Sequence, residues 1–140
     1  MLLVPTYVAK SELEGFGLFA KEAIPKGTPI WKFTPGFDLM LHVDFMQHFL
    51  SDTAREQVIH YGHREGNLYY LDSDDARFFN SVPDCNTETV AEGYDGTKEI
   101  IPNHIAVTRA ARDIAAGEEI TCNYAEFYGA YDPVERVSKL

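Results

Sequence analysis

The stretch Ala110-Ala-Arg-Asp-Ile-Ala-Ala-Gly-Glu-Glu-Ile-Thr-Cys-Asn-Tyr124 carries the pattern on which the fold prediction depends. Gly117 indicates a turn, and the β-branched residues after it predict a strand over residues 120–123 that ends at Tyr124. A phenol is neutral near pH 7 and can donate and accept hydrogen bonds. The strand would therefore end in a group that positions a partner without acting as a strong base.

The same spacing of Ala, Ile, Gly and Ile occurs earlier in the chain, as Ala20, Ile24, Gly27 and Ile30. Two copies are too few for a repeat array, in which several units must stack to bury a core. The repeated turn and strand therefore predict one domain that is rich in short, paired strands.

Length and composition are typical of one globular domain over residues 1–140. A hydrophobic fraction of 45% with 13% aromatic residues excludes wholesale disorder. No apolar run approaches the roughly 18 residues that cross a bilayer, and residues 1–7 lack the basic start of a signal peptide. We therefore expect a soluble, intracellular protein. Two cysteines argue against a disulfide framework and exclude a four-thiolate zinc site within one chain.

The charge balance is strongly acidic, with 22 acidic and 12 basic residues and a net charge of −10. Such a balance repels nucleic acid and attracts basic partners. A cationic peptide is the partner that the charge favours, although acidity also serves solubility alone.

Strand patterns bounded by turn signals occupy most of the chain. Pro5 predicts that the first strand, over residues 2–9, lies at a sheet edge, because proline cannot donate to a neighbouring strand. Further strands are predicted over residues 29–34, 67–72, 87–92 and 98–107, with a hairpin signal at Asp95-Gly96 before the last. The fold class expected from these patterns is mainly β.

A helical insertion interrupts the strands at about residues 38–65. Leu39, Val43 and Met46 recur at helical spacing, and Thr53 with Glu56 resembles a capping box for a helix that ends near residue 62. His60 and His63 could face a metal from one helix, but no carboxylate or cysteine completes a convincing ligand set, so no metal site is predicted. The tail over residues 125–140 is dense in aromatic residues, which either seal the core or cover a ligand.

The glycine pair in Gly15-Phe16-Gly17 is open to several interpretations. With Ala20 it matches a dinucleotide-binding fingerprint, but Pro25 and Gly27 would break the helix that this fingerprint requires. Two glycines around one residue also fit a tight turn, or a close approach of the backbone to a ligand.

Three segments, in the right order, resemble the motifs of the SET-domain protein-lysine methyltransferases, especially the minimal bacterial and viral forms without zinc-binding flanks. Gly15-Phe16-Gly17 is similar to the family's G-x-G motif. Tyr70-Leu-Asp72 and Arg77-Phe-Phe-Asn80 are similar to the segment before and within its R-F-x-N-H-S-C-x-P-N motif, and Gly117-Glu-Glu-Ile-Thr-Cys-Asn-Tyr124 is similar to its G-E-E-L-T-x-D-Y ending. The resemblance covers nearly the whole chain and implies a β-clip fold of short sheets with a knot-like C-terminal crossing.

The resemblance also implies an activity: S-adenosylmethionine-dependent N-methylation of a lysine in a basic protein or peptide. It implies that Tyr124 is the catalytic residue and that the Asn80 amide holds a polar edge of the cofactor. The cofactor contacts that it implies are Glu14, Gly15, Phe16, Gly17, Leu18, Phe79, Asn80, Ser81 and Phe127. The substrate-channel walls that it implies are Tyr70 and Tyr128.

The middle motif departs from the family pattern after Asn80. Histidine, serine, cysteine and proline of the pattern are replaced by Ser81, Val82, Pro83 and Cys85, and Asn123 replaces the aspartate before the tyrosine. Because this segment binds the cofactor in the family, two alternatives stay open: a SET-fold module that binds cofactor or basic peptide without methyl transfer, and a purely structural protein. A homodimer is also expected, since a minimal domain can need a second chain to complete its peptide groove.

Overall fold

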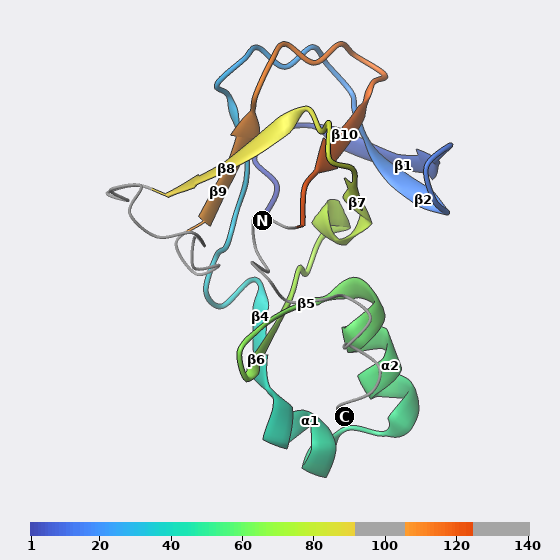
Figure 1. The fold of residues 1–140 in the computed structure, drawn as a ribbon, viewed down its shortest axis with the longest axis vertical. Coiled ribbons are helices and arrows are strands. Elements are labelled where there is room, and N and C mark those ends of the chain that lie inside the picture. The colour runs from blue at the N-terminus through green and yellow to red at the C-terminus, as the bar shows by residue number, and fades with distance from the viewer. Residues whose placement is uncertain (92–105, 125–140) are drawn as a thin grey trace.

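The computed structural model describes residues 1–91 and 106–124, which form a mainly β fold with a helical insertion (Figure 1). The described elements, in chain order, are β1 Thr6–Lys10, β2 Phe16–Ala20, β3 Pro29–Lys32, β4 Leu39–His42, α1 Val43–Phe49, α2 Asp52–Tyr61, β5 His63–Glu65, β6 Leu68–Leu71, the 3-10 helix η1 Asp75–Phe78, β7 Asn80–Ser81, β8 Thr87–Ala91, β9 Ala106–Ala110 and β10 Glu119–Cys122. The predicted fold class is confirmed. The predicted hairpin around residues 95–96 and the aromatic tail lie outside the described residues.

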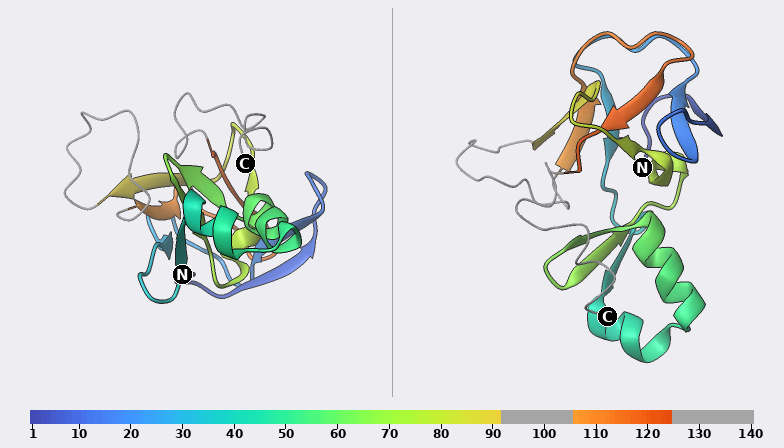
Figure 2. Two further views of the ribbon diagram at one scale, coloured as in Figure 1. Left: turned by 90° about the horizontal axis from the view of Figure 1, so that it is seen from below. Right: turned by 45° about the vertical axis from the view of Figure 1, so that its right-hand side comes forward.

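The strands form small sheets with the orders β1-β2-β10-β7, β3-β9-β8 and β4-β6-β5. The first two occupy one end of the molecule, and the third lies with α1 and α2 at the other end, a division that persists when the view is turned (Figures 1 and 2). β1 stands at the edge of its sheet, as Pro5 predicted. Neither described helix is long and apolar enough to cross a membrane.

The two copies of the Ala-Ile-Gly-Ile spacing lie against each other in a reciprocal arrangement. Their central isoleucines exchange backbone hydrogen bonds of 2.8 and 2.9 Å. The Gly27 N–H donates to the Ala110 carbonyl at 2.8 Å, and the Gly117 N–H donates to the Ala20 carbonyl at 2.7 Å. Both glycines have a φ near +85°, which favours glycine. Every alanine and isoleucine of the pattern is at most 4% exposed. The repeat therefore joins the sheet β1-β2-β10-β7 to the sheet β3-β9-β8 through the core.

The last strand, β10, is held on both edges by the segments that carry the other motifs. It pairs antiparallel with β2, which contains the second glycine of the G-x-G motif, and parallel with β7, which begins at Asn80. Asn86, after β7, accepts from the Thr121 N–H at 2.9 Å and donates to the Glu119 carbonyl at 2.7 Å. The Thr87 hydroxyl donates to the Thr121 carbonyl at 2.7 Å. Segments that are distant in sequence therefore meet around one strand.

The helical insertion differs in detail from its prediction. Residues 39–42 form β4, paired with β6, rather than the first helical turn; the backbone ladder to a neighbouring strand outweighs the helical spacing of the side chains. The helix α2 is capped by Ser51, whose Oγ accepts from the Ala54 N–H at 3.2 Å, so the predicted capping box at Thr53 is wrong. The predicted end of this helix near Gly62 is confirmed.

Candidate functional site

An open cleft of about 560 Å³ lies where the turn before β2, the end of α2, η1 and β7 meet. Small-molecule sites typically enclose roughly 300–1,000 Å³, so the cleft has the size of a cofactor site. Its lining residues are Glu14, Gly15, Phe16, Ile59, His60, Tyr61, Arg77, Phe78, Phe79, Asn80, Ser81 and Tyr124. Most of the cofactor contacts predicted from the sequence, and the predicted catalytic tyrosine, are thus brought together.

The glycine turn at the cleft is shaped by two different needs. Gly15 has a φ of +48°, a left-handed conformation that favours glycine. Gly17 is required by close packing instead, because a Cβ at this position would collide with the Glu119 carboxylate. Gly17 and Leu18 do not line the cleft, and the Leu18 side chain is fully buried in the core. Gly17 and Leu18 could therefore contact a ligand in the cleft only through their backbone atoms.

The Asn80 amide holds the glycine turn in place. Its Nδ2 donates to the carbonyls of Glu14 and Phe16 at 3.2 and 3.1 Å, and to Glu119 Oε1 at 2.8 Å. The Ser11 hydroxyl shares its one hydrogen between the two oxygens of the same carboxylate, which lie 2.9 and 2.8 Å away. The amide nitrogen therefore bonds to the protein itself, where the sequence led us to expect a direct bond to a ligand.

Tyr124 is fixed at the wall of the cleft by two hydrogen bonds. Its hydroxyl donates to the Phe79 carbonyl at 2.7 Å, and its backbone N–H donates to Ser81 Oγ at 2.9 Å. Ser81, which stands where the family pattern has histidine, thus anchors the backbone of the tyrosine. The hydroxyl can still accept a hydrogen bond through its oxygen.

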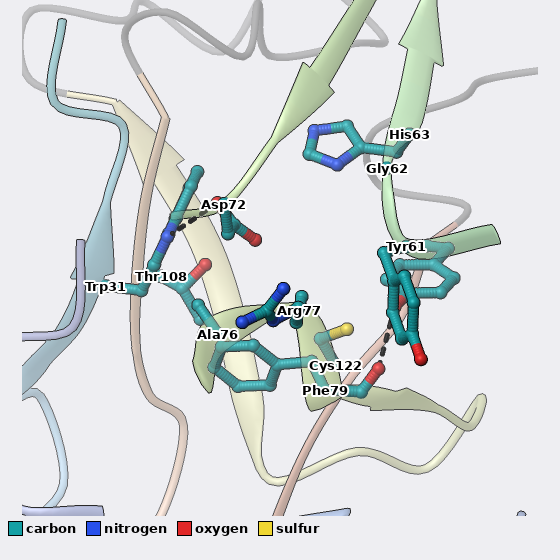
Figure 3. A pocket seen from close by; sticks show the side chains of 11 residues that line it. Trp31, Tyr61, Gly62, His63, Asp72, Ala76, Arg77, Phe79, Thr108 and Cys122 are labelled. Atoms are coloured by element: carbon teal, nitrogen blue, oxygen red, sulfur yellow. Dashed lines mark hydrogen bonds between the residues drawn. The ribbon is translucent and has the colours of Figure 1, made fainter. Parts of the chain in front are cut away.

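A second, smaller cavity of about 30 Å³, whose lining side chains are drawn in Figure 3, shares Tyr61, Arg77, Phe79 and Tyr124 with the cleft. Its lining residues are Trp31, Tyr61, Gly62, His63, Asp72, Ala76, Arg77, Phe79, Thr108, Cys122 and Tyr124. A cavity needs about 10–15 Å³ by this measure to hold a water, so this one has room for two small groups. Tyr124 lines both spaces.

One carboxyl group belongs to the small cavity. Asp72 Oδ1 accepts a hydrogen bond from Trp31 Nε1 at 3.1 Å. Burial and the negative charges of Asp38 and Asp74 together raise the pKa of Asp72 to about 7, although the Met1 amine and the hydrogen bond from Trp31 act in the opposite direction. The group therefore changes its charge near neutral pH.

Tyr70, predicted as a channel wall, lines neither cavity. It is 3% exposed, meets the Phe33 ring edge-on at 5.4 Å between centroids and stacks with the His63 ring at 5.7 Å. Burial, followed by the nearby Glu65 carboxylate, raises the pKa of Tyr70. The strand pattern placed this side chain in the core face of β6 instead. Phe127 and Tyr128 lie outside the described residues.

Several site residues were not predicted from the sequence. The Arg77 guanidinium carbon lies 5.8 Å from the centroid of the Tyr61 ring and 5.7 Å from that of Phe78. Arg77 could have been found from its place in the R-F-x-N motif, whereas Tyr61 gave no signal beyond its position before a helix-ending glycine. His60 lies in α2 and His63 in β5, so they do not share one helix face. Within residues 1–91 and 106–124, no group of three His, Cys, Asp or Glu residues could hold a metal ion.

The sequence matches the SET domain family over residues 15–125, and a search of the curated proteins found no match. A candidate histone methyltransferase of Plasmodium falciparum has a similar structure, with a TM-score of 0.58 at 18% identity over 88% of this chain and 95% of its own. Two structures of Polycomb Repressive Complex 2 each give a TM-score of 0.61. The first, ctPRC2 bound to S-adenosylmethionine, is 24% identical over 97% of this chain and 17% of its own. The second, a humanized mutant of the Chaetomium thermophilum complex bound to the inhibitor GSK343, is 22% identical over 96% and 16%. The chain thus spans a small part of both Polycomb chains, and the likeness is one of fold.

Proposed function

The chain belongs to the SET-domain family, and from this premise we propose that it is an S-adenosylmethionine-dependent protein-lysine N-methyltransferase acting on a basic protein or peptide. The observation that carries the proposal is the position of Tyr124. Its side chain lines a cofactor-sized cleft and a small cavity at once, while its hydroxyl is fixed by the Phe79 carbonyl. A methyl donor and an amine that entered from the two sides would meet at this residue.

The chemistry of the cleft fits S-adenosylmethionine. The Glu14 carboxylate can pair with the amino group of the cofactor, and the exposed ring of Phe16 offers a face for adenine. Phe127, in the tail, is the proposed second stacking ring. When bound, the cofactor would supply a methyl group on a positively charged sulfur.

The residues of the small cavity would prepare the amine. Trp31, Tyr61 and Phe79 surround the space with aromatic rings, and desolvation there disfavours an ammonium group and lowers the pKa of a lysine. The Tyr124 oxygen can accept a hydrogen bond from the amine, or weak C–H contacts from the methyl group. Alignment of two reactants can supply about 7–11 kcal/mol of the barrier, so positioning alone accounts for much of the expected rate.

The net charge of −10 supports a basic substrate, because complementary charge speeds encounter and disfavours acidic partners. A homodimer that completes a peptide groove stays a prediction.

The residues after Asn80 differ from the family's motif, and this difference favours a second candidate function: a SET-fold module that binds cofactor or basic peptide without methyl transfer. The geometry argues for the enzyme, since Ser81 holds the Tyr124 backbone where the histidine is missing. Incubation with methyl-labelled S-adenosylmethionine and a panel of basic proteins separates the two. Label fixed to lysine supports the enzyme, and cofactor binding without label on any protein supports the binding module.

A further inference from the structure

The carboxyl group of Asp72 has one oxygen that the described residues do not use. Asp72 follows β6 directly, and its Oδ1 bonds to the Trp31 indole at 3.1 Å. Oδ2 has no hydrogen-bond partner within the described part of the chain, and it points away from Trp31 toward the middle of the small cavity (Figure 3). Asp72 is half-buried, and a partly desolvated carboxylate oxygen without a protein partner favours a cation beside it.

Charged and titratable groups face Asp72 from several elements. Asp38, before β4, and Asp74, before η1, add negative charge, and the Met1 amine, which binds Asp38 Oδ2 at 2.8 Å, adds positive charge. The other titratable residues that line the cavity are Tyr61, His63, Arg77, Cys122 and Tyr124. Arg77 is exposed and lies over the rings of Tyr61 and Phe78, and no ion pair joins it to Asp72 among the described residues. The carboxylates of Asp72, Asp38 and Asp74 thus favour an ammonium group in this cavity and oppose the desolvation by the aromatic rings, so the lysine can enter charged and lose its proton there.

We propose that Asp72 binds the ammonium group of the substrate lysine in the small cavity and accepts its proton. This inference rests on the methyltransferase function proposed above and makes Asp72 a catalytic residue beside Tyr124. An N–H bond of the ammonium breaks and an O–H bond forms on Asp72, while the electron pair of the broken bond stays on nitrogen as the lone pair that accepts the methyl group. The proton later leaves Asp72 to solvent.

The charge state of Asp72 suits this role. With a pKa of about 7, the group is partly ionised at neutral pH and can take up a proton there, which is the condition under which a general base works best. An ordinary aspartate would be too weak a base, and a fully solvated lysine would rarely lose its proton at this pH.

The first test needs no methyl transfer. The titration of Asp72 is followed by carbon NMR of labelled aspartate, assigned with Asp72→Asn, in the presence of n-butylammonium as a mimic of the lysine side chain. The pKa of Asp72 should fall when n-butylammonium binds, because a neighbouring positive charge favours the carboxylate. Potassium chloride at equal ionic strength is the control and should leave the pKa unchanged. An equal titration curve in the two salts would overturn the proposal.

The second test is the pH profile of methyl transfer to the best-labelled basic protein. Asp72→Asn should lower kcat/KM at pH 7 by at least about tenfold. The deficit should shrink by pH 9.5, where more of the lysine has lost its proton to water. Asp72→Glu, which keeps the acid, should recover part of the activity at pH 7.

Asp74→Asn serves as the matched control, because Asp74 is an acid of the same cluster that does not line the cavity. Its negative charge raises the pKa of Asp72, so its removal should shift the rising limb of the pH profile to lower pH with the plateau preserved. A purely structural role for Asp72 predicts a loss in Asp72→Asn that is the same at every pH.

The outcomes separate the two proposals. A wild-type protein that transfers methyl groups while Asp72→Asn keeps the same pH profile contradicts the role of Asp72 and leaves the enzyme standing. A wild-type protein that binds cofactor but labels no protein at any pH contradicts the enzyme, and the role of Asp72 is then overturned with it.

Discussion

At the scale of single residues, the Tyr124 hydroxyl is the group whose removal should change chemistry without changing the fold. In Tyr124→Phe the only described hydrogen bond from this hydroxyl, to the Phe79 carbonyl, is lost, and the ring can stay in place. We expect methyl transfer to fall by about a hundredfold or more, as for other preorganised polar groups at a reacting centre. Cofactor affinity should stay within about fivefold, since a lost hydrogen bond contributes only about 1 kcal/mol.

Tyr7→Phe is the matched control, because Tyr7 stacks on Phe19 away from both cavities. It should keep full activity. Equal activity in the Tyr124 and Tyr7 variants would refute the role given to Tyr124.

Glu119 should affect cofactor binding and not the chemical step, because its carboxylate joins Ser11 and Asn80 to the glycine turn. In Glu119→Gln, one acceptor oxygen becomes a donor and faces hydrogen-bond donors. We expect calorimetry to show about tenfold weaker binding of S-adenosylmethionine, with kcat at saturation little changed. Glu118→Gln, which instead loses contacts to Arg112 and the Ala115 N–H, should bind the cofactor as wild type does. A similar affinity in both variants would show that Glu119 does not position the turn.

At the scale of elements, the pairing of β10 with the segment after β7 depends on Asn86, which is 3% exposed. Asn86→Ala would leave the Thr121 N–H and the Glu119 carbonyl buried without these partners. Each unsatisfied group costs about 1–3 kcal/mol, so the free energy of unfolding should fall by about 3 kcal/mol in urea denaturation. Asn67→Ala, at an exposed turn, should change it by less than about 1 kcal/mol. A small effect at Asn86 would mean that other contacts hold the crossing.

The elements also show what the sequence could predict. Turns at glycine and strands with β-branched residues are local signals, so the repeated Ala-Ile-Gly-Ile pattern, the edge strand and most strand positions followed from them. The reciprocal pairing of the two copies is a long-range contact, and no local pattern encodes it. The same limit explains β4: residues 39–42 have a helical spacing, and only the presence of β6 makes them a strand.

The site likewise contains residues that the sequence could predict and residues that it could not. Gly15, Asn80 and Tyr124, which were predicted from the motifs, lie at the same cleft. Asp72 was noticed only as part of a motif, because its pKa depends on burial and on neighbours such as Asp38 that are distant in sequence. The position of Tyr70 behind the cavities likewise depends on which face of β6 packs against the core.

At the scale of the whole molecule, the half-buried carboxyl group of Asp72 should make folding stability depend on pH. The pKa of Asp72 rises from 3.8 to about 7 on folding, so the folded state binds the proton more tightly than the unfolded state. This group therefore costs no stability below pH 3.8, and its cost grows as pH rises to about 7 and is constant above that. The cavity thus keeps a group that weakens the fold at neutral pH, as functional sites often do.

Asp72→Asn should remove this cost while its Oδ1 still accepts from Trp31. We expect the variant to exceed wild type in free energy of unfolding by about 2–3 kcal/mol more at pH 8 than at pH 5, since one pKa unit corresponds to about 1.4 kcal/mol. Urea denaturation at the two pH values measures this difference. A gain that is equal at both pH values would contradict the raised pKa.

Calorimetric titration of the wild-type chain and of Gly17→Ala with S-adenosylmethionine tests whether the cleft at the glycine turn is a cofactor site. A Cβ on residue 17 would push against the Glu119 carboxylate and displace the turn that lines the cleft. We expect saturable binding of one cofactor per wild-type chain, and binding at least about tenfold weaker in the variant. No saturable binding to the wild-type chain, or equal affinity in the two proteins, would contradict the proposed cofactor site.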